Sequence, residues 1–386
     1  MSNFPKKLAQ KIAGRKAENA FRKLDGPRNL IDFSSNDYLG FATSSKLDEY
    51  AQGFLKTGKG NMKCGATGSR LLTGNHELYA KLENHLAIFH NAEAALVFNS
   101  GYDANLGFFS SVPQRNDIVL YDELCHASIR DGIKLGLAKS FKFEHNNFED
   151  LQRKLDLAKE KSGQADAVEV YVVTESVFSM DGDSPDLLDL AELCKEKALR
   201  LIVDEAHAVG VFNRGRVHEW SLEDQVFARI ITFGKALGCH GAAILGNHEL
   251  KEYLVNFARS LIYSTALSPH AIGMVLAAYQ EMQGNHGLKN MRQLRQSITF
   301  FNHEIDKNGL RSCFKKSDSA IQVCQIGGNA KVKAIAGVLI EKGFDVRPIL
   351  APTVPKHQER LRFCIHSFNT EEEIKKVLQT LKTSLE

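Results

Sequence analysis

The sequence of 386 residues predicts an α/β fold built on a mainly parallel sheet, followed by a smaller α+β domain. From about residue 75 to about residue 250, short apolar runs alternate with longer runs whose apolar residues recur at helical spacing. The short runs are apolar almost throughout, which is typical of parallel strands that helices cover on both faces. Beyond about residue 270 the pattern changes to long helical runs and a few short strands.

The elements of the large region follow one another regularly. A helix is expected at 76–90, where Leu78, Leu82 and Leu86 share one side, and another at 186–198. The strand-like runs lie at 94–101, 117–123, 169–176, 199–207, 229–235 and 241–246.

The remaining elements define the domain limits. Helical runs at 271–283 and 288–306 lead into a mixed region with runs at 320–327, 331–349, 360–366 and 370–385. We expect an N-terminal arm over 1–45, a large domain over 46–285 and a small C-terminal domain over 286–386. The arm carries eight basic residues between Lys6 and Arg28 against Glu18 and Asp25, and it is predicted to form an amphipathic helix.

Composition excludes several classes of protein. The net charge is only +3 and is dispersed, which argues against a nucleic-acid partner. No apolar run approaches the length that spans a bilayer, so no membrane partner is expected. The seven cysteines are scattered without a C-x-x-C pair, which predicts reduced thiols in the cytoplasm and no metal site.

Two charged residues stand where the sequence otherwise predicts a core. Lys235 follows the strand-like run 229–233, which contains Ile230, Ile231 and Phe233, and a desolvated lysine has a lowered pKa and becomes a nucleophile. Asp204 follows the run 199–203, and a buried carboxylate needs a cationic partner such as a protonated pyridine nitrogen. His207, three residues later, could reach the same ligand.

Other polar residues also follow predicted strands, where open parallel sheets bind ligands. The backbone N–H groups of Gly101 and Tyr102 could hold a phosphate at a helix N-terminus, although the segment also suits an ordinary strand–helix turn. His126 could stack on an aromatic ring or cap a helix. Glu175 and Ser179 close another strand, and the "MDGD" after them also makes an ordinary turn.

Together these residues match the requirements of pyridoxal 5′-phosphate (PLP). The lysine would form a Schiff base with the cofactor aldehyde, and the aspartate would keep the pyridine nitrogen protonated so that the ring accepts carbanion electrons. Each signal is weak alone. Their order along the chain and the interval of 31 residues from Asp204 to Lys235 strengthen the set.

Over nearly the whole chain the sequence resembles the α-oxoamine synthases, which are PLP enzymes of fold type I. The resemblance implies a mainly parallel, seven-stranded sheet and the decarboxylative condensation of an amino acid with an acyl thioester. The motifs that carry it are "FSSNDYLG" (33–40), "GSRLLTGNHELYAKLE" (68–83), "DELCHAS" (122–128), "ESVFSMDGD" (175–183), "VDEAHAVG" (203–210), "TFGKALG" (232–238), "YSTALSP" (263–269) and "PTVPKHQERLRF" (352–363).

The resemblance also implies a role for each catalytic residue. Lys235 would carry PLP and move the α-proton, Asp204 would pair with the pyridine nitrogen, and His126 would stack on the ring. Ser179 and His207 would lie near the ring hydroxyl, with His207 also facing the thioester carbonyl.

The phosphate and the subunit arrangement follow from the same motifs. Gly101, Tyr102 and Thr232 would bind the phosphate. Ser264 and Thr265 would reach the phosphate of the neighbouring subunit, which implies a homodimer with shared active sites.

The substrate side departs from the family pattern. Arg22, Asn36 and Thr353 match substrate-side positions. Biotin-pathway members commonly read R-P-P-T-V-P, whose arginine binds the amino-acid carboxylate, but here Leu350 stands at that position. We therefore expect Arg347 to bind the carboxylate.

Several activities remain open. The overall pattern favours the biotin-pathway reaction of L-alanine with pimeloyl-CoA or pimeloyl-carrier protein. Glycine C-acetyltransferase, serine palmitoyltransferase and 5-aminolevulinate synthase share the chemistry. A non-catalytic partner subunit is expected to lack Lys235, and a dehydrogenase needs a G-x-G-x-x-G turn after a strand. Tyr79 stands where a second histidine is frequent, and the sequence does not assign it a role.

Overall fold

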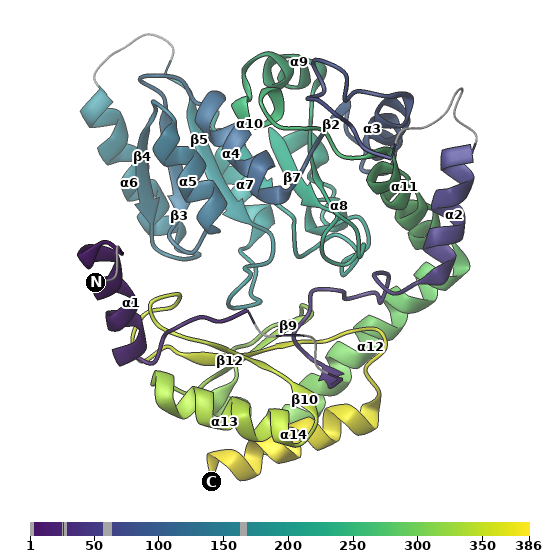
Figure 1. Ribbon diagram of the computed structural model, residues 1–386. Helices are drawn as coiled ribbons and strands as arrows, with labels where there is room; N and C mark the ends of the chain where they lie inside the picture. The colour runs from purple at the N-terminus through teal and green to yellow at the C-terminus, as the bar shows by residue number, and fades with distance from the viewer. Residues whose placement is uncertain (1–3, 25, 27–28, 57–63, 163–167) are drawn as a thin grey trace. The chain divides into compact units, whose positions relative to one another are not determined.

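A computed structural model describes residues 4–24, 26, 29–56, 64–162 and 168–386 (Figure 1). The chain forms two compact units. The larger unit comprises Asn36–Ser179 and Ser184–Arg292, and the smaller unit comprises Met1–Ser35, Met180–Asp183 and Gln293–Glu386. The boundaries expected after residues 45 and 285 stay a prediction about the domains.

The larger unit is built on a seven-stranded sheet with the order β2-β8-β7-β6-β5-β3-β4. All strand pairs from β7 to β4 are parallel, whereas β8 runs antiparallel to both β2 and β7. This arrangement confirms the predicted α/β class and its mainly parallel sheet. The strands are β2 (Ala94–Phe98), β3 (Ile118–Asp122), β4 (Lys139–Phe143), β5 (Val170–Glu175), β6 (Arg200–Asp204), β7 (Ala228–Thr232) and β8 (Ala242–Gly246).

The apolar strands are buried because helices cover both faces of the sheet. One face packs on α4 (Gly101–Ser111), α5 (Ala127–Leu135), α9 (His248–Phe257) and α10 (Arg259–Ile262), and the other on α6 (Phe148–Ser162) and α7 (Leu187–Glu196). Successive strand residues alternate between the two cores: Val119 belongs to the first, and Ile118 and Leu120 to the second.

The larger unit contains further helices besides those that cover the sheet. They are α2 (Ser45–Lys56), α3 (Glu77–Phe89), α8 (Arg216–Glu219) and α11 (Pro269–Gln283), and α12 (Asn285–Lys307) continues into the smaller unit. Helices α2 and α11 pack against each other, and they lie side by side in Figure 1.

The smaller unit is an α+β structure, as predicted. Its antiparallel sheet has the order β11-β12-β9 and consists of β9 (Ile321–Gln325), β11 (Arg347–Ile349) and β12 (Arg360–Cys364). A short parallel pair joins β1 (Ile31–Asp32) to β10 (Phe344–Asp345). The helices are α1 (Lys6–Ala17), α13 (Asn329–Glu341) and α14 (Glu371–Leu385). Among the residues described, no helix is both long and apolar enough to cross a membrane.

Four residues from the middle of the chain, Met180–Asp183, belong to the smaller unit. The Asp181 carboxylate pairs with the buried Arg360, and the Gly182 carbonyl accepts hydrogen bonds from the Ser317 and Ser319 hydroxyls at 2.7 and 2.9 Å. Gly182 has a φ of 75°, and a Cβ there would lie 2.2 Å from the Ile321 carbonyl oxygen. Only glycine suits this position, because both the backbone conformation and the available space exclude a side chain.

Candidate active site

Most of the predicted cofactor residues gather at one edge of the seven-stranded sheet. Asp204 is the last residue of β6, Thr232 is the last residue of β7, and Glu175 is the last residue of β5. His126 follows β3 and is the N-cap of α5. Because these parallel strands all end at the same edge, residues distant in sequence come together where ligands bind in such sheets.

The lysine that the sequence singles out is part of a hydrogen-bonded chain. Lys235 is half-buried, and its Nζ lies 2.6 Å from Nε2 of His207. Nδ1 of His207 lies 2.8 Å from the buried Tyr38 hydroxyl, which donates to Oδ1 of Asn36 at 3.2 Å. Since Tyr38 gives its proton to Asn36, its oxygen accepts from Nδ1–H of His207. With this polarity Nε2 of His207 is the acceptor that faces the lysine, and the two ring nitrogens together hold the imidazole between Tyr38 and Lys235.

Asp204 is a buried carboxylate whose described partners are neutral. The side chain is 5% exposed, Oδ2 accepts from Nδ2 of Asn105 at 2.9 Å, and Oδ1 accepts from the backbone N–H of Ala206 at 2.9 Å. These two donors orient the carboxylate without neutralising it. A buried negative charge of this kind is suited to a cationic ligand atom.

A serine and an asparagine connect Asp204 to His126. Ser128 Oγ accepts from Asn105 Nδ2 at 3.0 Å and lies 2.8 Å from Nδ1 of His126. Asn105 therefore holds the carboxylate and the histidine segment at once. Sequence reasoning missed both residues, although an asparagine inside the otherwise apolar stretch "NLGFF" was a usable signal.

Glu175 is a second buried carboxyl group beside Asp204. The two residues are register partners on β5 and β6, and Oε1 of Glu175 accepts from the backbone N–H of His126 at 2.6 Å. Burial, followed by the negative charge of Asp204, raises the pKa of Glu175 to about 8, while Lys235 and backbone N–H donors from His126 and Ser179 act in the opposite direction. Glu175 is therefore protonated at neutral pH and positions the segments of His126 and Ser179.

The predicted phosphate-binding residues Gly101 and Tyr102 are the first two residues of α4. Ser100 caps this helix by accepting from the N–H of Asp103, which leaves the N–H groups of Gly101 and Tyr102 at the first turn without an intrahelical acceptor. Gly101 lies beside the Thr232 hydroxyl, since a Cβ on Gly101 would be 3.7 Å from Oγ1 of Thr232, an ordinary van der Waals contact. The Tyr102 side chain is exposed, and its hydroxyl donates to Asp131 at 2.7 Å.

The predicted intersubunit residues lie on an irregular segment after α10. Thr265 is exposed and Ser264 is half-buried. The Thr265 carbonyl accepts from Nδ2 of Asn99 at 2.7 Å, two residues before Gly101. Their contact with a neighbouring subunit stays a prediction.

The predicted substrate residues divide between the two units. Asn36 lies in the larger unit and is the far end of the hydrogen-bonded series that runs through Tyr38 and His207 to Lys235. In the smaller unit, Nη2 of Arg22 donates to Oγ1 of Thr353 at 3.0 Å, and both residues are exposed. Arg347 is exposed and pairs with Asp345 at 3.0 Å. Their roles toward a substrate stay predictions.

The donor set of the larger unit fits PLP. It combines an amine on Lys235, a buried carboxylate on Asp204 for the pyridine nitrogen, and a helix N-terminus beside the Thr232 hydroxyl for the phosphate. Oδ1 of Asn105 is also buried without a hydrogen-bond partner at this edge. The arrangement can hold a planar, cationic and phosphorylated ring.

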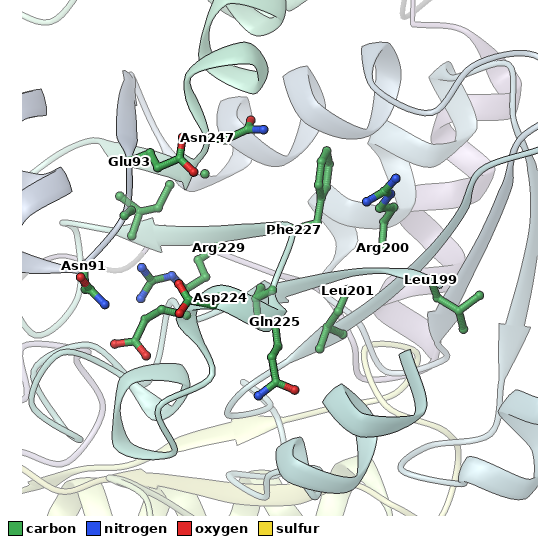
Figure 2. Close-up of a pocket in the computed structure, with 15 residues that line it drawn as sticks. Asn91, Glu93, Leu199, Arg200, Leu201, Asp224, Gln225, Phe227, Arg229 and Asn247 are labelled. Atoms are coloured by element: carbon green, nitrogen blue, oxygen red, sulfur yellow. The ribbon is translucent and has the colours of Figure 1, made fainter. Parts of the chain in front are cut away.

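A hollow elsewhere on the larger unit is distinct from this site. It is lined by residues at the amino ends of β6 and β7, among them Arg200, Phe227 and Arg229 (Figure 2). Nη2 of Arg229 already donates to the His90 carbonyl. The hollow therefore lies at the edge of the sheet opposite Asp204 and Lys235.

Comparison with known proteins identifies the family. The model of the class I and II aminotransferases matches residues 28–381. The chain belongs to this family. The family is PLP-dependent, which confirms the predicted cofactor.

Individual proteins within this family are similar to the chain over most of its length. The chain is 38% identical to the 8-amino-7-oxononanoate synthase of Emericella nidulans over 377 residues, covering 93% of this chain and 90% of that protein. The crystal structure of 8-amino-7-oxononanoate synthase from Francisella tularensis has a TM-score of 0.74 and 29% identity, covering 92% of this chain and 97% of that one. A serine palmitoyltransferase variant from S. paucimobilis with bound PLP–myriocin shares the fold, with a TM-score of 0.86 at 23% identity over 98% and 96% of the two chains. The predicted PLP fold type I is therefore confirmed.

Proposed function

We propose that this enzyme condenses L-alanine with a pimeloyl thioester and releases carbon dioxide, giving 8-amino-7-oxononanoate for biotin synthesis. The new carbon–carbon bond joins the α-carbon of alanine to the thioester carbonyl carbon, and the thiol leaves as CoA or as the carrier protein. The names of the relatives and their similarity along most of the chain support this reaction.

The observation that carries the proposal is the contact between Lys235 and His207. Nζ lies 2.6 Å from Nε2, beside the buried carboxylate of Asp204. An accessible amine in contact with a proton acceptor is what covalent cofactor attachment and proton movement both require. When bound, PLP supplies the electron sink for the carbanion.

The residues of the chain have separate tasks in this reaction. With PLP bound, Asp204 would keep the pyridine nitrogen protonated, and Gly101, Tyr102 and Thr232 would bind the phosphate. Lys235 takes the α-proton at Nζ, and His207 accepts or returns a proton at Nε2. Tyr38, which also bonds Asn36, holds the His207 ring through Nδ1, so that Nε2 faces the lysine.

His126 and Ser179 orient the ring, and Glu175 positions both through their backbone N–H groups. Arg22, Asn36, Arg347 and Thr353 bind the substrates, with Arg347 on the amino-acid carboxylate. A guanidinium suits that task because it meets a carboxylate through two parallel hydrogen bonds.

We infer a homodimer in which Ser264 and Thr265 of one subunit reach the cofactor phosphate of the other. The exposed position of Thr265 supports this arrangement. We also place the enzyme in the cytoplasm, because its seven cysteines are free thiols.

Covalent trapping tests the site. The protein incubated with PLP and reduced with borohydride should carry the cofactor on the tryptic peptide of Lys235, and Lys235→Ala should carry none. Attachment to a different lysine, or no attachment at all, would contradict the assignment.

A substrate panel tests the reaction. L-alanine, glycine and L-serine are each incubated with short, medium and long acyl-CoA thioesters, among them pimeloyl-CoA, and also with pimeloyl-carrier protein. The products are identified by mass spectrometry. We expect product from L-alanine with pimeloyl thioester. Efficient turnover of only glycine with acetyl-CoA or succinyl-CoA, or of serine with palmitoyl-CoA, would assign the chain to another α-oxoamine synthase.

A further inference from the structure

The segment 264–267 is held by its backbone rather than by its side chains. The Thr265 carbonyl accepts from Asn99 at 2.7 Å, and the backbone N–H of Ala266 donates to the Gly68 carbonyl at 3.0 Å. Gly74 lies against the same place, since a Cβ there would be 2.7 Å from Cβ of Ala266. These contacts fix the main chain and leave the exposed Thr265 side chain available.

The buried Tyr79 also contacts the backbone of this segment, at Leu267. The tyrosine is 1% exposed on α3, and its hydroxyl accepts from the backbone N–H of Leu267 at 2.8 Å while lying 3.4 Å from the Leu267 carbonyl oxygen. Burial raises the pKa of Tyr79 to about 12. The hydroxyl therefore stays protonated and can serve both groups of Leu267 at any physiological pH.

The tyrosine ring is itself held by a charged cluster around the buried Glu83. The Arg70 guanidinium lies over the ring with its Cζ 4.0 Å from the centroid. Nη1 of Arg70 donates to Glu83, whose other oxygen lies 2.8 Å from Nζ of Lys251. Because a cation over an aromatic face and a paired carboxylate both resist displacement, the hydroxyl of Tyr79 is a fixed reference point for the segment.

We propose that Tyr79 is a positioning residue that sets segment 264–267, and with it the cofactor phosphate site of the neighbouring subunit. The inference rests on the proposed function, which places Ser264 and Thr265 at that phosphate. It assigns Tyr79, which the sequence left without a role, to PLP binding in trans.

A matched pair of variants separates positioning from stability. Tyr79→Phe removes the hydroxyl that binds Leu267. Tyr279→Phe removes an equally buried hydroxyl, whose hydrogen-bond partner is Nε2 of His90 at 2.9 Å rather than a group of the segment. The readout is the PLP concentration that gives half-maximal borohydride trapping on Lys235, and thermal unfolding of the apoprotein is measured in parallel.

Both variants should lower the thermal stability, but only Tyr79→Phe should weaken PLP binding. The expected weakening is about three- to tenfold, the equivalent of one buried hydrogen bond. Equal PLP affinity of Tyr79→Phe and the wild type would overturn the proposal.

Hybrid dimers test whether the effect acts in trans. One subunit carries Lys235→Ala, so that trapping reports only the site of the other subunit. With Tyr79→Phe placed on the same subunit as Lys235→Ala, the reporting site faces an altered segment and PLP affinity should fall. With Tyr79→Phe on the opposite subunit, the reporting site faces an intact segment and affinity should match the wild type.

Each outcome decides one question. A wild-type protein that traps no PLP on Lys235, or that is monomeric, would overturn the proposed function together with this inference. A wild-type dimer that traps PLP, with two hybrids of equal affinity, would overturn only the role of Tyr79. Should Tyr79→Phe fail to fold, Asn99→Ala in the same two hybrids removes another support of the segment, and it should give the same asymmetry.

Discussion

Replacing the buried Glu175 by glutamine should change how the stability of the apoprotein depends on pH. In the folded chain the pKa of this carboxyl group is about 8 rather than 4.5, chiefly because of burial and then because of the charge of Asp204. Glu175→Gln resembles the protonated group and retains an oxygen that can accept from the His126 N–H. The substitution therefore removes the titration and keeps the positioning.

The sign of the effect follows from proton binding. Between pH 4.5 and pH 8 the folded state holds the Glu175 proton and the unfolded state releases it, so stability falls as the pH rises through this range. Each pKa unit corresponds to about 1.4 kcal/mol, so the interval from 4.5 to about 8 gives a loss of at most about 5 kcal/mol. The Glu175→Gln variant should not show this pH-dependent loss of folding stability.

Urea unfolding of the apoprotein from about pH 5 to about pH 8.5 measures the difference. The variant should exceed the wild type by less than about 1 kcal/mol near pH 5 and by a few kcal/mol near pH 8, within the limit set above. Glu192→Gln, at an exposed position on α7, serves as the control and should follow the wild type. Parallel curves for Glu175→Gln and the wild type would refute the reasoning, because they would mean that Glu175 does not titrate in this interval.

Three further measurements test the site and the assembly. Asp204→Asn should retain PLP through Lys235 and the phosphate contacts but lose turnover by about ten- to a hundredfold, as expected for a lost charge-assisted contact, and near-normal turnover would exclude Asp204 as the pyridine partner. Arg347→Ala should lower the affinity of the PLP-loaded enzyme for L-alanine, measured by spectral titration, by about ten- to a hundredfold. An unchanged affinity at full PLP occupancy would mean that another residue binds the carboxylate. Light scattering should give twice the 42.9 kDa of one chain, and a fully active monomer would contradict the shared site.

The sequence predicted the parts of the fold that depend on local pattern. The buried strands β2, β3, β5, β6, β7 and β8 are apolar runs, and the structure contains them close to the expected limits. Strand β4 escaped prediction because "KSFKF" contains two lysines and a serine among its five residues and lies at the edge of the sheet, where most of its side chains are accessible. Apolar continuity marks central strands but not edge strands.

The sequence predicted only those residues of the candidate site that directly follow a strand. Asp204 and Lys235 stand out because charge follows an apolar run. Tyr38 contacts His207 across 169 positions of sequence, and Asn105 contacts Asp204 across 99. No local pattern encodes such distances, because they depend on how the strands and helices assemble. These supporting residues therefore became visible only in the folded chain.

The pairing of β1 with β10 has a consequence for synthesis on the ribosome. Ile31 pairs with Phe344, so the early part of the smaller unit has no sheet partner until the late part has been made. At about 5 to 20 residues per second, that interval lasts roughly 15 to 60 s. The larger unit, complete at Arg292, can fold first, while residues before Asn36 and the excursion Met180–Asp183 await the last hundred residues. A nascent chain arrested before Phe344 should accordingly expose Phe33 and Asp181, which are buried in the finished protein, to proteases and chaperones.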